Sequence, residues 1–147
     1  MLAIGDSAPD FTLPDQDGRE RSLESLLAAG PLVLYFYPAD FTPVCTREAC
    51  AFGALESELS VKGVTLAGVS PQDSATHARF RKRYQLPFPL LADPERRVIH
   101  AYGCDTLWGL HVSRVTYLVT PDKRILDVAR GAFRLAPHLA LARKALG

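Results

Sequence analysis

The sequence carries little net charge and no long apolar segment. Its 147 residues include 17 Lys and Arg against 16 Asp and Glu, which leaves a formal charge of +1. A nearly neutral chain has no strong electrostatic attraction to nucleic acid or to an anionic membrane surface. No apolar run approaches the roughly 20 residues that are needed to span a bilayer. We therefore expect neither nucleic acid nor a membrane as a partner.

Cysteine is also scarce, and nothing at the start of the chain resembles an export signal. The segment MLAIGDSAPDF has no basic region followed by a long apolar one, so we expect a cytoplasmic protein. There are three cysteines, an odd number, in a chain too large to need disulfides for its stability. In a reducing compartment such cysteines are more often catalytic, metal-bound or inert than structural.

The composition is that of one globular domain. Hydrophobic residues make up 48% of the chain and charged residues 22%, both close to globular averages. We found no internal repeat, low-complexity tract or linker in the sequence. We therefore expect residues 1–147 to form a single domain with a substantial core.

Apolar runs and helical periodicity predict an α/β fold. The continuous apolar runs at residues 32–37 and 64–69 are typical of strands buried on both faces, and a periodic helix separates them. Strand, helix and strand in this order form a right-handed parallel crossover. The other expected elements are extended pieces at 11–13 and 20–23, helices at 23–29, 74–84, 94–102 and 136–146, and a hairpin at 115–120 and 124–129. Together they predict a central mixed β-sheet flanked by helices on both faces.

The segment TPVCTREAC, at residues 42–50, carries the main functional signal. Thr42 suits a helix N-cap and Pro43 suits the first helical position, which puts Cys45 in the first turn. Unpaired N–H groups and the helix dipole favour an anion there, and such positions can lower a thiol pKa from about 8.5 to about 3.5–7.5. A small buried hydrophobic residue is the alternative for Cys45. Its place after a buried strand favours a reactive thiolate.

The second cysteine of this segment lies on another side of the same helix. At about 100° per residue, Glu48, Phe52 and Leu59 share a stripe with Cys45 at its edge, and Cys50 falls nearly opposite. An exposed cysteine without a role is unusual, because free cysteine is among the most buried residue types. We therefore interpret Cys50 as a partner for Cys45.

The whole chain resembles the peroxiredoxins. Residues 38–45 fit the signature P-x-x-x-[T/S]-x-x-C, and the added Cys50 is similar to the bacterioferritin-comigratory-protein or peroxiredoxin Q branch. Further similarity lies in GDSAPDFTL, GVSPQDSATHARFRKRY, FPLLADPERRVIHAYG and RVTYLV. The resemblance implies a thioredoxin-like fold and a thiol peroxidase that uses no metal, haem or flavin.

The resemblance also assigns roles to matching residues. Cys45 corresponds to the peroxidatic thiolate, which attacks a hydroperoxide and becomes a sulfenic acid. Pro38 would shield it, the Thr42 hydroxyl would bind the peroxide, and Arg114 would stabilise the thiolate and the developing negative charge. Taken alone, Arg114 would instead be a surface charge at a strand end. Glu48 would orient Arg114, or would otherwise form a surface ion pair with a neighbouring arginine.

Cys50 would then resolve the sulfenic acid as an intramolecular disulfide, which thioredoxin or a similar dithiol reduces. Such a resolver needs no second subunit, so we expect a monomer. On a regular helix, residues five apart are separated by about 7.5 Å of rise and about 140° of rotation. Since a disulfide needs Cα atoms within about 4.4–6.8 Å, the first turns of this helix should unwind on oxidation.

The remaining candidates receive no catalytic role. We expect Cys104 to be buried and inert, and we interpret His77, His100, His111 and His138 as surface or packing residues, because their spacing does not suggest a metal site. Trp108 and Leu110 either line the mouth of the site or simply cover it. Two other functions stay open: a thiol–disulfide oxidoreductase or redox regulator, which would favour C-x-x-C spacing, and a non-catalytic binding module.

Overall fold

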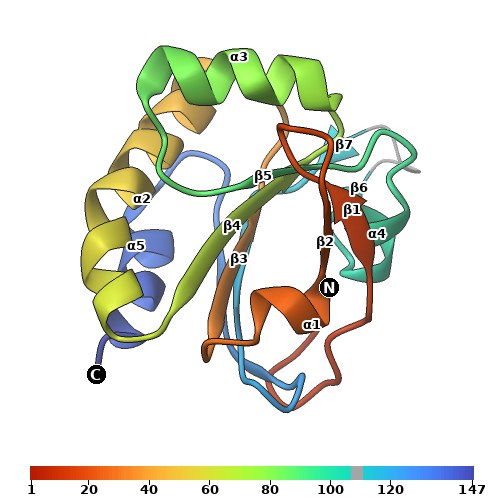
Figure 1. The fold of residues 1–147 in the computed structure, drawn as a ribbon. Helices are drawn as coiled ribbons and strands as arrows, with labels where there is room; N and C mark the ends of the chain where they lie inside the picture. Colours follow the sequence, from red (N-terminus) through yellow and green to blue (C-terminus); the bar gives the residue numbers. More distant parts are fainter. Residues whose placement is uncertain (107–110) are drawn as a thin grey trace.

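The computed structural model describes residues 1–106 and 111–147 and has a mixed five-stranded sheet at its centre (Figure 1). The strand order is β5-β4-β3-β8-β9. β3, β4 and β5 run parallel, whereas β8 pairs antiparallel with both β3 and β9. The bounds of these strands are Leu32–Phe36 for β3, Thr65–Ser70 for β4, Leu90–Ala92 for β5, Val115–Val119 for β8 and Ile125–Arg130 for β9. The predicted mixed sheet is therefore confirmed.

Helices cover both faces of this sheet. α2 (Pro43–Val61), α3 (Ser74–Tyr84) and α5 (Ala136–Lys144) pack on one face, and α2 and α5 lie side by side (Figure 1). α1 (Leu23–Leu26), α4 (Arg97–Ala101) and the hairpin of β1 (Thr12–Pro14) and β2 (Glu20–Ser22) cover the other. Among the described residues, no helix is long and apolar enough to cross a membrane.

The central strand β3 supplies side chains to two separate cores. All of its residues are buried, and successive side chains point to opposite faces. Val33 and Tyr35 join the core under α2, α3 and α5, whereas Leu34 and Phe36 join the core under α1 and α4. A strand with apolar neighbours on both faces must be apolar throughout, which explains the run that predicted it.

Three predicted helices are shorter in the structure, and the terminal one, expected at 136–146, ends at Lys144. The helix expected at 23–29 ends at Leu26, and the chain turns to Gly30, where a Cβ atom would lie 2.4 Å from the carbonyl oxygen of Gly63. The helix expected at 94–102 is confined to α4, because Arg96 adopts a left-handed conformation with φ of 59°. The sequence did not predict β5 or the small β6 (Asp105–Thr106) and β7 (His111–Val112) pair.

Candidate active site around Cys45

The helix that carries Cys45 begins where the sequence predicted. Thr42 has extended backbone angles, φ −82° and ψ 151°, and Pro43 is the first helical residue of α2. The Thr42 hydroxyl does not cap the helix, however: it donates to the carbonyl oxygen of Ala39 at 2.7 Å. Thr42 is therefore the N-cap residue by its backbone, as predicted, but its hydroxyl oxygen accepts no hydrogen bond from the first turn of α2. Some N–H groups of the first turn remain available to an anion beside Cys45.

Arg114 lies beside Cys45 because of the register between two strands. Phe36, the last residue of β3, pairs with Val115, the first residue of β8. Arg114 therefore stands next to the point where the chain leaves β3 for the Cys45 helix. Its Nη2 donates to the Cys45 sulfur at 3.3 Å, and the Cys45 residue is only 2% exposed.

The guanidinium of Arg114 is held on three sides. Besides the sulfur, Nη1 donates to Glu48 Oε1 at 2.5 Å and Nε donates to the Ala132 carbonyl oxygen at 2.8 Å. Burial alone would lower the pKa of Arg114, but Glu48 and Cys45 outweigh it and raise that pKa above its ordinary value. The alternative of a surface charge at a strand end is wrong, because Arg114 is buried.

Glu48 is fully buried, and it is one of two acidic groups that contact the single cation of Arg114. Burial raises its pKa to about 7, although Arg114 acts in the opposite direction. One cation thus faces two groups that can each be anionic, the carboxyl of Glu48 and the thiol of Cys45. A proton on Glu48 leaves the Arg114 charge to balance a Cys45 thiolate. The alternative of a surface ion pair for Glu48 is wrong.

His138 on α5 lies next to Glu48, and no motif in the sequence indicates this position. Its Nδ1 is 3.9 Å from Glu48 Oε2, an oxygen without a hydrogen-bond partner among the described residues. Nδ1 is also 2.7 Å from the Thr116 hydroxyl, and Nε2 is 3.1 Å from the Gly131 carbonyl oxygen. Since a carbonyl can only accept, Nε2 carries a proton, and burial lowers the pKa of the ring. His138 therefore braces the segment that anchors Arg114.

A pocket of about 330 Å³ opens beside the guanidinium. Pro38, Val115, Phe133 and Arg114 line it, together with the exposed Arg130. Cys45 is not among the residues that line this pocket, but its sulfur accepts from Arg114, which does line it. The described part of the wall is mostly apolar, with cationic side chains and no acidic one.

The three cysteines lie in different surroundings, and each is a free thiol. Cys50 is exposed, as the helical wheel predicted. Cys104 belongs to the core on the face of the sheet opposite to that of Cys45. Burial raises its pKa to about 12, and its sulfur lies 3.5 Å from the Tyr102 carbonyl oxygen. These features agree with the inert role predicted for Cys104.

Two of the four histidines are buried in polar networks rather than at the surface. His77 and His138 are completely buried, whereas His100 and His111 are exposed. Within residues 1–106 and 111–147, no group of three His, Cys, Asp or Glu side chains is arranged to hold a metal ion. The suggested roles of Trp108 and Leu110 fall outside the described residues.

The sequence is similar to a known protein family and to named relatives. The model of the AhpC/TSA family matches residues 4–128. The chain is 39% identical to the chloroplastic peroxiredoxin Q of Oryza sativa subsp. japonica over 146 residues, which cover 99% of this chain and 67% of that protein.

Solved structures give the same result. Peroxidoxin BcpB of Mycobacterium tuberculosis superposes with a TM-score of 0.92 at 36% identity, over 99% of this chain and 97% of that one. The bacterioferritin comigratory protein of Xanthomonas campestris was solved in work on its alkyl peroxide reduction activity. It superposes with a TM-score of 0.83 at 27% identity, over 100% of this chain and 99% of that one. The likeness confirms the predicted thioredoxin-like fold. The chain therefore belongs to the AhpC/TSA family, and its named relatives there include peroxiredoxin Q.

Proposed function

We propose that this protein reduces hydrogen peroxide and organic hydroperoxides with the thiolate of Cys45. The observation that carries the proposal is the contact between Arg114 Nη2 and the Cys45 sulfur at the start of α2. A guanidinium and the first turn of a helix both favour a thiolate over a thiol. The relatives named peroxiredoxin support the same activity.

In the first step the Cys45 thiolate attacks the terminal oxygen of the hydroperoxide. A sulfur–oxygen bond forms as the oxygen–oxygen bond breaks, so sulfur is oxidised by two electrons and the peroxide is reduced. The proton of the hydroperoxide passes to the leaving oxygen, which departs as water or an alcohol, and the Cys45 sulfenate that remains takes a proton from solvent to become the sulfenic acid. Arg114 stabilises the negative charge that develops on the two oxygens.

In this proposal Pro38 and Thr42 lie at the edges of the site where the hydroperoxide binds. Pro38 lines the pocket beside Arg114 and limits the access of water to the new sulfenic acid. The Thr42 hydroxyl already donates its proton to Ala39, so its oxygen is left as an acceptor for the O–H of a hydroperoxide. Its role is to orient the substrate rather than to donate to it.

In the second step the Cys50 thiolate attacks the sulfur of the Cys45 sulfenic acid. A disulfide forms and hydroxide leaves, which takes up the proton of the former Cys50 thiol as water. The exposure of Cys50 and the distance of Cys104, in the other core, support this choice of resolver. Thioredoxin or a similar dithiol then restores both thiols by disulfide exchange.

An intramolecular resolving cysteine allows a monomer to complete the cycle. Three free thiols suit a reducing compartment such as the cytoplasm. Both the monomeric state and this location are part of the proposal. The tightly apposed Cys45–Arg114 contact favours peroxide chemistry over general disulfide exchange, because a buried sulfur is accessible to a small peroxide but not to a protein disulfide.

The decisive experiment compares wild type with Cys45→Ser. Wild type should consume hydrogen peroxide with dithiothreitol as reductant, and Cys45→Ser should not, although a near-isosteric residue leaves the fold intact. Peptide mapping without reduction, after one equivalent of peroxide, should find Cys45 joined to Cys50. Retention of even about a tenth of the wild-type rate by Cys45→Ser would reject Cys45 as the nucleophile.

A further inference from the structure

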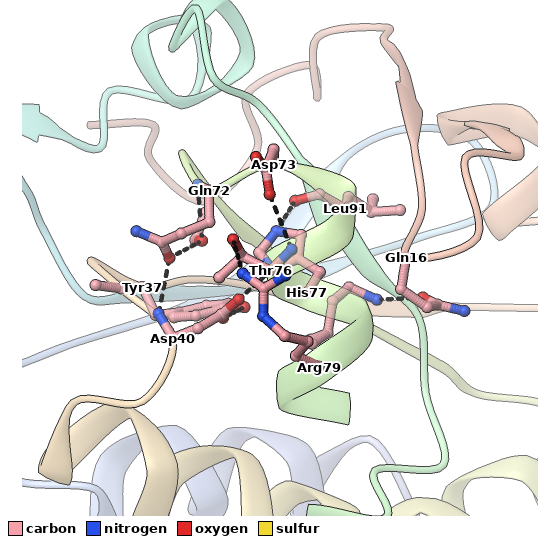
Figure 2. A network of polar contacts seen from close by, with 12 residues as sticks. Gln16, Tyr37, Asp40, Gln72, Asp73, Thr76, His77, Arg79 and Leu91 are labelled. Atoms are coloured by element: carbon pink, nitrogen blue, oxygen red, sulfur yellow. Dashed lines mark hydrogen bonds and ion pairs between the residues drawn. The ribbon is translucent and has the colours of Figure 1, made fainter. Parts of the chain in front are cut away.

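A buried polar network lies behind the loop that precedes the Cys45 helix. Asp40 is in the middle of this loop, residues 38–42, and its side chain is completely buried. Asp40 Oδ1 accepts a hydrogen bond from the Tyr37 hydroxyl at 2.6 Å, and Oδ2 is 2.6 Å from His77 Nδ1 (Figure 2). The Asp40 N–H donates to Gln72 Oε1 at 2.7 Å. The loop is thus tied to β3, to the end of β4 and to α3.

The hydrogen-bond partners of His77 show where protons lie on and beside its ring. Nε2 is 3.0 Å from the carbonyl oxygen of Leu91, which can only accept, so Nε2 carries a proton. Nδ1 faces the Asp40 carboxyl (Figure 2). A second proton must therefore lie between His77 and Asp40, and with it the pair forms a charge-assisted hydrogen bond in a site without solvent.

The loop needs such an anchor because its backbone is strained. Phe41, directly after Asp40, adopts a left-handed conformation with φ of 65°, which is unfavourable for a residue with a Cβ atom. Phe41 is 48% exposed as a residue, and its ring packs on those of Phe80 and Tyr84 of α3. Strain of this kind persists only where neighbouring contacts hold it. Thr42 and the Cys45 helix follow immediately.

We propose that His77 is a positioning residue for the peroxide step, acting through Asp40 to hold the 38–42 loop in the conformation that binds hydroperoxide. The hydrogen bonds of the His77 ring go to Asp40 and Leu91 and not to Cys45 or Arg114, so its effect passes through the loop that carries Pro38 and Thr42. The proposal rests on the proposed function, because it concerns the geometry of that same site. Small displacements of positioning groups cost a reaction heavily while leaving the nucleophile itself intact.

Two substitutions separate this role from general support of the fold. His77→Asn keeps a donor where Nδ1 faces Asp40 and loses the bond to Leu91. His77→Gln keeps a donor where Nε2 faces Leu91 and loses the bond to Asp40. Both remove the ring from a buried site, so both destabilise the protein. Only His77→Gln should release the loop.

The experiment uses single turnover in a Cys50→Ser background, where peroxide oxidation stops at the Cys45 sulfenic acid. Mass spectrometry with a sulfenic-acid trap follows oxidation by hydrogen peroxide, and a parallel sample follows alkylation of Cys45 by iodoacetamide. His77→Gln should slow the peroxide step by about tenfold. His77→Asn should retain most of the rate, and the rate of alkylation should be unchanged in both.

The matched control is His100→Gln. His100 also pairs with a carboxylate, that of Asp105 at 2.7 Å, but its side chain is 78% exposed and far from the loop in sequence. This variant should behave as its parent in both reactions. If His77→Gln does not fold, Tyr37→Phe removes another bond to Asp40 without a change of charge and should slow the peroxide step selectively.

Three results would overturn the inference. The first is an unchanged rate of peroxide oxidation in His77→Gln or, if that variant does not fold, in Tyr37→Phe. The second is a peroxide rate in His77→Asn that falls as far as in His77→Gln. The third is a rate of Cys45 alkylation that falls together with the peroxide rate. Failure of the proposed function looks different, because the Cys50→Ser parent itself would then form no sulfenic acid at Cys45. A parent that reacts normally and a His77→Gln variant that matches it would reject the role of His77 alone.

Discussion

The Nη2 nitrogen of Arg114 lies 3.3 Å from the Cys45 sulfur, although the two residues are 69 positions apart in the chain. Neighbouring strands β3 and β8 bring them together, and Glu48 and Ala132 fix the other two sides of the guanidinium. A planar group with donors on three sides satisfies all of these contacts at once. A lysine ammonium could not reach them in the same geometry.

Replacement of Arg114 should therefore impair the peroxide step much more than the resolving step. Arg114→Ala and Arg114→Lys should each lower the rate of Cys45 oxidation by about 10²–10³, the effect of losing one preorganised donor to a developing oxyanion. Stopped-flow measurement of single-turnover oxidation provides the test. Arg47→Ala, which removes an exposed charge from the same helix as Cys45, is the control and should react as wild type. Wild-type kinetics in Arg114→Ala would rule out this role.

Cys50→Ser should complete one round of peroxide reduction and then stop. Without a resolving thiol, a trappable sulfenic acid should accumulate on Cys45, and thioredoxin should no longer support turnover. Mass spectrometry with a sulfenic-acid trap and a coupled thioredoxin assay measure the two effects. Cys104→Ala should cycle normally, because that thiol lies in the opposite core and burial raises its pKa to about 12. Normal cycling by Cys50→Ser would move the resolving role to another thiol.

Glu48 should make the stability of the fold depend on pH. Its pKa is about 7 in the folded protein against an ordinary value of 4.5, so the folded state keeps a proton that the unfolded chain releases between these values. The free energy of unfolding of wild type should therefore fall as pH rises from 4.5 to 7, by at most about 3 kcal/mol from this group. Glu48→Gln should lack this part of the slope.

Urea unfolding at several pH values between 4.5 and 7 tests this prediction. Glu58→Gln is the matched control, since Glu58 is an exposed carboxylate on the same helix and should leave the slope as in wild type. Parallel curves for wild type and Glu48→Gln would contradict a raised pKa for Glu48.

Oxidation should unwind the start of α2. Cys45 and Cys50 point to different sides of an intact helix, with Cα atoms roughly 8.7 Å apart, beyond the span of a disulfide. Amide hydrogen exchange should show lost protection from residue 43 to about residue 52 in the disulfide form, where the completely buried Phe52 anchors the rest of the helix. Cys50→Ser treated with peroxide should keep its protection. Equal protection in the reduced and disulfide forms would refute the switch.

The elements with strong local signals could be predicted from the sequence. The apolar runs of β3, β4 and β8 reflect burial on both faces, and α3 has the predicted bounds. Cys45 could be placed because Thr42 and Pro43 mark a helix start after a buried strand. These signals lie within a few residues of the structures that they predict.

The features that depend on distant contacts could not be predicted in this way. His77 and His138 are ordinary polar residues in their helical patterns. Only the packing of α3 and α5 shows that His77 reaches Asp40 in the loop and that His138 reaches the carbonyl oxygen of Gly131. The Thr42 hydroxyl can accept from an N–H of the first helical turn or donate to the preceding loop, and only the path of that loop brings the Ala39 carbonyl oxygen within reach. Arg114 resembled a surface charge because no local pattern reveals the strand that pairs with its own.

The terminal helix has a consequence for how this protein can be divided. The AhpC/TSA family model ends at residue 128, whereas α5 begins at Ala136 and covers the face on which Glu48 is buried. A fragment cut at the end of the family match would expose that carboxyl to water and would lack both the Ala132 carbonyl oxygen, which holds Arg114, and the imidazole of His138. The match to the family model thus stops short of residues that complete the site, and a minimal functional fragment must keep residues up to the end of α5.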